Sequence, residues 1–267
     1  MKNTKLLLPF LSLLITLSAC SYNSGQPTDK EKSFAEAYAL QRISVLQHSM
    51  KDPVVGFKAG LTSEKSQDAF NTEQPLVGAL FYSGLSRDRA AYALHNYKDL
   101  RLEVELGFVL RHAITQPITT DQLPQYIKAM LPVVELPNLR FTSKEDMTAL
   151  TLVTNNVASN QFIIGRAFPF EPARINSLEA NLFRNGVEVN HGLATDAMDD
   201  QREALVWMIN KLLAVGYKLE ANHLLITGAL GTMLPAQRGQ YEARFTLDAE
   251  KHNSEKEADA VIAFSIR

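Results

Sequence analysis

Two glutamates separated by one residue carry the strongest chemical signal in the chain. Glu103 and Glu105 lie in the run Arg101-Leu-Glu-Val-Glu-Leu-Gly-Phe108, where apolar residues alternate with charged ones. Alternation with period two predicts a half-buried strand over 100–111, with both carboxylates projecting from the same face. Like charges held that close raise each other's pKa unless a cation lies between them.

A third carboxylate, Glu135, lies in a second apolar run, Leu131-Pro-Val-Val-Glu-Leu136. If Glu103, Glu105 and Glu135 meet, they form a hard-oxygen site suited to Mg²⁺ or Mn²⁺. A metal that shares such a site with a substrate usually acts as a Lewis acid. The six histidines show no ligand spacing, so we assign none of them a role.

The N-terminus has the layout of an export signal. Lys2 and Lys5 precede an apolar stretch over 6–17, which is shorter than the roughly 20 residues needed to span a bilayer. The chain then reads Leu17-Ser-Ala-Cys20, which resembles the lipobox of bacterial lipoproteins. This resemblance implies a signal peptide over 1–19, lipid on Cys20 and attachment to a membrane. An uncleaved anchor helix would leave the protein on the same membrane.

The residue after the cysteine bears on location. By the sorting pattern of lipoproteins, Ser21 rather than Asp at this position predicts a protein of the cell envelope, attached to the periplasmic face of the outer membrane. The polar, turn-rich segment 20–32 is typical of a flexible tether. With its one cysteine lipidated, the mature chain has no thiol left for a disulfide. A net charge of -2 does not indicate a basic surface for binding nucleic acid. It also offers little attraction to a membrane surface, so we expect membrane attachment through lipid.

Residues 33–267 read as one α+β domain with a small helical region at its start. Strands outnumber helices and do not alternate regularly with them. Asn185-Gly186 is a strong hairpin turn signal, and the charged segment 248–259 indicates a solvated loop. The patterns predict helices over 31–50, 64–70, 121–130 and 202–213, and strands over 54–61, 78–82, 100–111, 131–136, 150–154, 161–165, 178–187, 189–191, 223–228, 240–246 and 260–266.

Five stretches of the chain carry a further pattern, namely Val55-Gly-Phe-Lys-Ala-Gly-Leu-Thr62, Gln74-Pro-Leu-Val-Gly-Ala-Leu-Phe81, Leu102-Glu-Val-Glu-Leu-Gly-Phe-Val109, Val134-Glu-Leu136 and Ile226-Thr-Gly-Ala-Leu-Gly-Thr-Met-Leu-Pro235. Together, in this order, they resemble the hydratase and decarboxylase branch of the fumarylacetoacetate hydrolase superfamily. This branch contains 2-keto-4-pentenoate hydratases and 4-oxalocrotonate decarboxylases. The resemblance runs from about residue 35 to the end and implies a fold of mixed β-layers with an acidic metal site, as well as a homo-oligomer.

The resemblance also implies residue roles. Glu103, Glu105 and Glu135 match the metal ligands of the family, and Lys58 matches its active-site lysine. Thr227-Gly228 matches a pair that helps to hold the substrate carboxylate. A 2-oxo acid can chelate a metal through its carboxylate and keto oxygens, and the metal then stabilises charge on the keto oxygen during enolisation. Lys58 could shuttle a proton or neutralise charge beside the carboxylate.

Three departures from the family pattern keep other functions open. Leu76 and Asn155 stand where the family has acidic residues, and Asn160 replaces a small residue. The main hypothesis is a divalent-metal-dependent lyase, of hydratase or decarboxylase type, acting on small 2-oxo acids. One alternative is a catalytically weakened envelope lipoprotein that binds a dicarboxylate or oxo acid, or is purely structural. Another is an acylpyruvate-type hydrolase of carbon–carbon bonds, which needs a His–carboxylate pair; between Phe57 and Glu103 only His95 is available.

Overall fold

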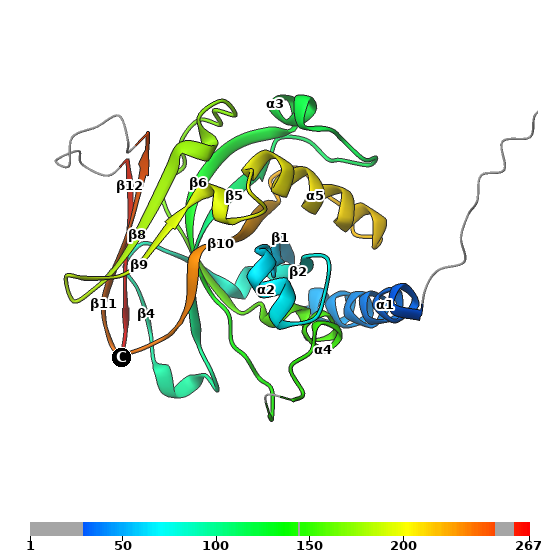
Figure 1. The fold of residues 1–267 in the computed structure, drawn as a ribbon, viewed down its shortest axis with the longest axis horizontal. Helices are drawn as coiled ribbons and strands as arrows, with labels where there is room; N and C mark the ends of the chain where they lie inside the picture. The colour runs from blue at the N-terminus through cyan, green and yellow to red at the C-terminus, as the bar shows by residue number, and fades with distance from the viewer. Residues whose placement is uncertain (1–28, 144, 249–258) are drawn as a thin grey trace, which may run out of the picture.

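Two β-sheets form the body of the protein in a computed structural model that describes residues 29–143, 145–248 and 259–267 (Figure 1). The larger sheet has the order β2-β1-β10-β5-β6-β7-β3 and the smaller one β4-β12-β11-β8-β9. Most neighbours are antiparallel, while β1 and β10, β3 and β7, and β4 and β12 pair in parallel. The strands are β1 (Val54–Gly60), β2 (Leu76–Phe81), β3 (Leu85–Arg87), β4 (Ala90–Tyr92), β5 (Arg101–Leu110), β6 (Ile127–Leu136), β7 (Gln161–Ile164), β8 (Leu178–Arg184), β9 (Val187–Leu193), β10 (Leu224–Pro235), β11 (Gly239–Leu247) and β12 (Ala260–Ile266).

The helices lie around the larger sheet, where α1 and α4 pack side by side (Figure 1). The buried Gln41 side chain holds α1 in place, because its Nε2 donates to the carbonyls of Val77 and Val153 and its Oε1 accepts from the Tyr217 hydroxyl. The helices are α1 (Asp29–Ser49), α2 (Glu64–Ala69), α3 (Leu123–Tyr126), α4 (Ala149–Thr154) and α5 (Gln201–Ala214). Single 3₁₀ turns occur at Tyr82–Gly84, Leu94–Asn96, Thr120–Gln122, Asn156–Ala158, Ile175–Ser177 and Ala194–Asp196.

The core is built by strands whose apolar residues alternate or run continuously. On β5, Leu102, Val104, Leu106 and Phe108 are all buried. Between them, Glu105 is also fully buried, and Glu103 keeps only limited exposure. The hydrophobic effect therefore places this strand in the interior, and its acidic side chains are desolvated as a consequence.

Several sequence predictions are confirmed. The α+β class and the mixed β-layer fold are both present, with a small helical region at the start. The hairpin turns at Asn185-Gly186, where φ is +51° and +81°, as a type I′ turn requires. Helix α5 matches the prediction over 202–213, and Gly216 follows it with φ of +86°.

Two predicted elements are wrong. The predicted strand at 150–154 is α4, because Thr148 and Thr151 form a capping box that starts a helix despite β-branched residues. The predicted helix over 121–130 stops at Tyr126, because Ile127 begins β6, which pairs with β5 along its length. Long-range pairing there outweighs local helix propensity.

The bounds of α1 and β10 also differ from the predicted ones. Helix α1 begins at Asp29, so the last residues of the predicted tether are helical. Strand β10 continues past residue 228 to Pro235, with register shifts between 226 and 229 and between 230 and 234. The predicted signal peptide 1–19, Cys20 and most of the tether lie outside the described residues, as does nearly all of the predicted loop 248–259.

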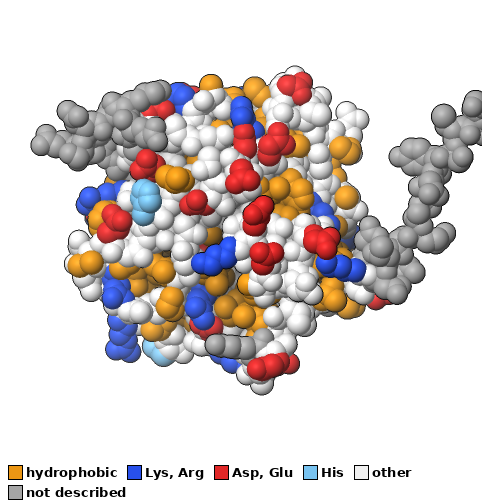
Figure 2. Space-filling model, in the orientation of Figure 1, with side chains coloured by type: hydrophobic (Ala, Val, Ile, Leu, Met, Phe, Trp, Pro, Cys, Tyr) orange, Lys and Arg blue, Asp and Glu red, His pale blue; other side chains and the backbone are white. Residues whose placement is uncertain are grey.

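The surface carries mixed charge. On the face in Figure 2, acidic and basic side chains are interspersed with apolar ones. Among the residues that the structure describes, no helix is long and apolar enough to cross a bilayer.

Candidate active site

The pairing of β5 with β6 brings the three predicted metal ligands together. Glu103 lies directly opposite Glu135 in the antiparallel register, and Glu105 follows two residues along the same face of β5. One carboxylate oxygen from each residue lies within 4.8 Å of the others. The predicted convergence is therefore present, while the binding of an ion by this cluster stays a prediction.

Lys58 enters this cluster from β1. Its Nζ lies 2.6 Å from Oε2 of Glu135 and 3.9 Å from Oε2 of Glu103. The lysine is buried, with 3% of its surface exposed. If all three carboxylates are ionised, one ammonium leaves a local excess of negative charge that a divalent cation would balance.

Burial and mutual repulsion shift the pKa values in the cluster. Burial raises the pKa of Glu103 to about 7; the Lys58 charge works against this rise, and Glu135 adds to it. Burial and the neighbouring carboxylates raise the pKa of Glu105 well above its usual range. Burial lowers the pKa of Lys58, but the three carboxylates outweigh it and raise this pKa above its ordinary value. Lys58 is therefore an ammonium at neutral pH.

The cluster has free ligand atoms of the type that hard cations prefer. Oε1 of Glu105 and Oε1 of Glu135 are buried and accept no hydrogen bond from the described residues. Buried carboxylate oxygens without a donor are costly, and Mg²⁺ or Mn²⁺ coordination would satisfy them. The residues present therefore fit a divalent metal.

Gly228 holds one ligand in place. Its N–H donates to Oε2 of Glu105 at 2.9 Å, and its φ of +111° is in the region that glycine favours. A Cβ at this position would lie 2.2 Å from Oγ1 of Thr62, so no other residue fits. The family resemblance implied a role for Gly228 at the substrate carboxylate and not this contact with Glu105. Its contact with a substrate carboxylate stays a prediction.

The Thr227 side chain is bonded within the interior of the fold. Its side chain is fully buried, and its hydroxyl donates to Oε1 of Gln201 at 2.6 Å, with Leu106 O at 3.3 Å. Gln201 in turn donates from Nε2 to the Ala194 carbonyl. The structure thus assigns the Thr227 hydroxyl to a joint between β10 and α5, and the substrate contact predicted for it is not tested.

A cavity of about 330 Å³ opens beside Lys58 and Glu103, and we call it the catalytic cavity. Its polar groups come from β1, β5 and the start of α2, and its walls are mainly apolar. Its lining within the described residues includes no histidine. The lining residues are Lys58, Ala59, Gly60, Leu61, Thr62, Ser63, Ser66, Phe70, Arg101, Glu103, Pro137, Leu139, Met147, Leu152, Val157, Ala158, Ala229, Gly231 and Met233.

Arg101 is a cavity residue that sequence reasoning missed. Its guanidinium pairs with Asp99 at 2.8 Å, while its buried Nε has no hydrogen-bond partner in the described chain. The signal was present in the sequence, because Arg101 shares a strand face with Glu103 and Glu105. It supplies a second cationic group to the catalytic cavity.

The three departures from the family pattern lie elsewhere. Leu76 is fully buried on β2 opposite Gly60 and packs in the core. Asn155 ends α4 and donates to the Thr151 carbonyl, and it lines a second cavity together with Asn160. Leu76, Asn155 and Asn160 are all absent from the lining of the catalytic cavity.

The two sheets form the mixed β-layer fold that is found in fumarylacetoacetate hydrolase-like proteins. The 4-oxalocrotonate decarboxylase of Pseudomonas putida G7, complexed with magnesium and adipate, superposes with a TM-score of 0.77. Its sequence is 20% identical, and the match covers 88% of this chain and 86% of that one. No family model matches the sequence.

Two curated hydratases are similar in sequence to most of the chain. The 2-keto-4-pentenoate hydratase of Paraburkholderia xenovorans is 29% identical over 226 residues, covering 81% of this chain and 83% of the relative. The 2-oxo-hept-4-ene-1,7-dioate hydratase of Escherichia coli is 27% identical over 218 residues, covering 78% and 81%. The chain is thus similar in sequence to 2-keto-4-pentenoate hydratases and similar in fold to a 4-oxalocrotonate decarboxylase.

Proposed function

We propose that this protein is a divalent-metal-dependent lyase, of hydratase or decarboxylase type, that acts on small 2-oxo acids. The observation that carries the proposal is the convergence of Glu103, Glu105 and Glu135 around Lys58 at the edge of the catalytic cavity. The curated relatives are hydratases, which supports a lyase.

The three glutamates would hold the metal, with Mg²⁺ as the first choice because all donors are carboxylate oxygens. When bound, the metal supplies positive charge to the keto oxygen of a 2-oxo acid as the substrate enolises. With that charge stabilised, water can add to a double bond conjugated with the keto group, or a β-positioned carboxylate can leave as carbon dioxide. In both cases the electron pair passes to the keto oxygen, and the enolate of the product forms.

Lys58 is the proton carrier in this proposal. Its ammonium lies at the edge of the catalytic cavity, within reach of a substrate bound there. Nζ can give a proton to the electron-rich carbon of the enol form and take one back in the reverse step. Glu135, at 2.6 Å, fixes the position of Nζ for this transfer.

The remaining walls of the catalytic cavity suit a short carbon chain. Apolar side chains such as Phe70, Leu152 and Met233 can cover its carbons, and Ser63 and Ser66 offer hydroxyls. Arg101 adds a positive charge to the same cavity, which fits an anionic substrate.

The proposal is tested by calorimetry with Mg²⁺ and then with oxalate, a planar mimic of the enolised acid. We expect Mg²⁺ to bind the wild type and oxalate to bind only once Mg²⁺ is present. Glu105→Gln should lose Mg²⁺ binding while its circular dichroism spectrum stays native. Full Mg²⁺ binding and activity in Glu105→Gln would exclude the site.

Turnover then separates the lyase from its alternatives. A 2-hydroxydienoate should lose its ultraviolet absorbance when the protein and Mg²⁺ are added. Oxalate binding without any turnover would instead favour a binding lipoprotein. Cleavage of an acylpyruvate would favour the hydrolase, although no histidine lines the catalytic cavity in the described chain.

We further propose that the protein is anchored in the cell envelope by lipid on Cys20, facing the periplasm from the outer membrane. The support is the run Leu17-Ser-Ala-Cys20 after the apolar stretch 6–17. Expression with labelled palmitate should label the wild type and leave Cys20→Ala unlabelled. Equal labelling of both would refute the anchor.

A further inference from the structure

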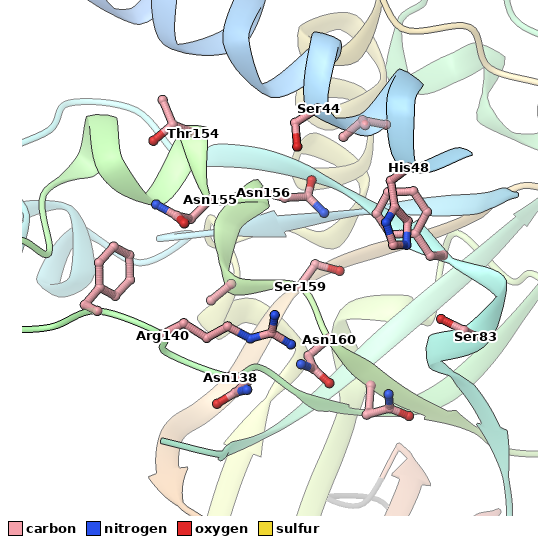
Figure 3. Close-up of a pocket in the computed structure, with 15 residues that line it drawn as sticks. Ser44, His48, Ser83, Asn138, Arg140, Thr154, Asn155, Asn156, Ser159 and Asn160 are labelled. Carbon is pink, nitrogen blue, oxygen red and sulfur yellow. The ribbon is translucent and has the colours of Figure 1, made fainter. Parts of the chain in front are cut away.

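A second cavity, of about 370 Å³, lies between the end of α1, the segment after β6 and the turn after α4 (Figure 3). We call it the amide cavity because five amide side chains line it. Its volume is in the range of small-ligand sites, which is about 300 to 1,000 Å³. It is lined by Ser44, Val45, His48, Phe81, Ser83, Asn138, Arg140, Phe141, Thr154, Asn155, Asn156, Ala158, Ser159, Asn160 and Gln161.

As far as the described residues show, the lining is rich in hydrogen-bond donors and contains no carboxylate. Arg140, Ser159, Asn160 and Gln161 form no side-chain hydrogen bond or ion pair with the described residues. Figure 3 shows the guanidinium of Arg140 extended toward Ser159 and Asn160. A guanidinium and neutral amides without partners form a surface that complements an oxyanion.

Asn138 supplies a donor whose orientation is fixed. It is buried, with 5% of its surface exposed, and its Oδ1 accepts from the backbone N–H groups of Lys98 and Asp99. Because both of these partners are donors, the amide cannot be flipped, and Nδ2 is the end left for a ligand. Asn138 is therefore a preorganised donor rather than a mobile surface group.

Asp52 is an acidic residue in contact with two lining residues, Ser83 and His48. Its oxygens already accept from Ser83, through both the backbone N–H and the hydroxyl, and one of them lies 3.2 Å from Nε2 of His48. Arg140 is solvent-exposed and forms no ion pair with the described residues, so its charge is available to a ligand.

The amide cavity shares a wall with the catalytic cavity. Ala158 lines both, Val157 lines the catalytic cavity, and Asn156 lines the amide cavity. These residues form the turn Asn156–Ala158, which we call the connecting turn. A ligand against Ser159 and Asn160 would press on the residues that directly follow it.

The connecting turn is strained. Its three residues have φ of +53°, +51° and +54°, in the left-handed region that side-chain-bearing residues avoid, and Val157 is β-branched. The Asn156 side chain clamps the turn to β2, because it accepts from Ala79 N–H at 2.7 Å and donates to Ala79 O at 2.8 Å. Backbone strain of this kind persists only while the surrounding contacts hold it in place, so this turn depends on the contacts around it.

We propose that the amide cavity binds a small hydroxylated organic anion with a carboxylate or phosphate head, and that this ligand alters the catalytic cavity through the connecting turn. Arg140 binds the anionic head, while Asn138, Asn160 and Ser159 bind its remaining oxygens. The binding site stands independently of the proposed lyase activity, whereas its effect on turnover rests on that activity.

The test uses glycerate and glycerol 3-phosphate as probes, in calorimetry with the full-length chain. We expect at least one probe to bind the wild type and Glu105→Gln equally, and the tighter probe identifies the head group. Arg140→Gln should weaken binding by about tenfold or more, and Asn160→Asp should abolish it by placing a negative charge in the cavity. Arg166→Gln, which removes the same charge outside the cavity, should bind like the wild type.

Three outcomes would overturn the site. Equal affinity for wild type and Arg140→Gln would show that the cavity is not used. Loss of binding in Glu105→Gln would assign the probe to the metal cluster instead. Binding that none of the variants changes would be adventitious.

The coupling between the amide cavity and the catalytic cavity can be measured without using the enzyme's activity. Saturating probe should slow amide hydrogen exchange in residues 155–160 of the wild type and leave Arg140→Gln unchanged. It should also change KM or kcat for a 2-hydroxydienoate in the wild type alone. Unchanged exchange in a probe-saturated wild type would refute the coupling, whatever the enzyme's activity.

Discussion

Lys58 is a buried cation whose surroundings fix its protonation state. Its ammonium lies 2.6 Å from Glu135 and 3.9 Å from Glu103, so removing it leaves a purely acidic cluster. For Lys58→Met we expect Mg²⁺ affinity to be equal or tighter, because a competing positive charge is lost. We expect kcat to fall by about 10²- to 10⁴-fold, the usual contribution of a proton-transfer group.

The matched control is Lys65→Met, at an exposed lysine on α2 close to the catalytic cavity. It should retain wild-type kcat and Mg²⁺ affinity. Calorimetry and steady-state kinetics on both variants separate metal binding from proton transfer. Unchanged kcat in Lys58→Met would remove Lys58 from the reaction.

Glu103 makes the metal-free cluster sensitive to pH. Its pKa is raised to about 7 mainly by burial, so its ionised form is unfavourable in the folded metal-free protein. A carboxyl whose folded pKa is raised destabilises the fold as pH climbs from its unfolded pKa through its folded pKa. Because Mg²⁺ binds the ionised form, the stabilisation by Mg²⁺ should grow over the same interval.

The measurement is Tm with and without Mg²⁺ between about pH 5 and about pH 8. The shift in Tm on adding Mg²⁺ should be larger at the upper end, and Glu103→Gln should flatten its pH dependence. A Tm shift that is constant with pH in the wild type would contradict this assignment.

At the scale of elements, the joint between β10 and α5 holds the segment that carries Gly228. The Thr227 hydroxyl donates to Gln201, which lies in the first turn of α5, and both side chains are fully buried. Thr227→Val keeps the shape but leaves Oε1 of Gln201 without a donor. We expect a loss of about 1 to 3 kcal/mol in the free energy of unfolding, measured by urea denaturation.

The same variant decides between two roles for Thr227. If its hydroxyl serves the joint, KM for the substrate stays close to the wild-type value. If it holds the substrate carboxylate, as the family resemblance implies, KM rises while stability changes little. A double variant with Gln201→Leu should recover part of the lost stability, because both polar partners are then removed.

Local signals determined some elements correctly and failed at others for a physical reason. Alternation on β5 and the Asn185-Gly186 turn depend on neighbouring residues, so the sequence contained what was needed. The segment 127–130 became strand because β5 offered hydrogen-bonding partners, and no local pattern reveals a partner that distant. The segment 149–154 became helix through a Thr148–Thr151 capping box that the β-branched residues concealed.

At the scale of the whole molecule, α1 exposes an apolar stripe. Leu40, Ile43, Leu46 and Met50 are between 55% and 83% exposed and follow one another on one face of the helix or just past its end. Exposed apolar stripes are typical of interaction sites. We predict that this stripe forms the contact between copies of a homo-oligomer.

Size-exclusion chromatography with light scattering measures the mass of the protein in solution. Leu46→Glu should reduce the oligomer to a smaller species, because it places a charge in the contact. Val187→Glu adds the same charge at another exposed apolar position, on β9, and should leave the mass unchanged. A wild-type mass equal to that of one chain would exclude the oligomer.

The sequence by itself determined the chemistry on offer: three glutamates in two apolar runs, a lysine in a glycine-rich strand, and motifs in the family's order. These depend on residue type and near spacing, which the chain carries directly. Only the tertiary structure decided that Glu135 lies opposite Glu103, that Thr227 faces Gln201, and that Leu76 and Asn155 lie apart from the catalytic cavity. Strand order and register arise from contacts between segments far apart in the chain, and these are set by burying the whole core at once.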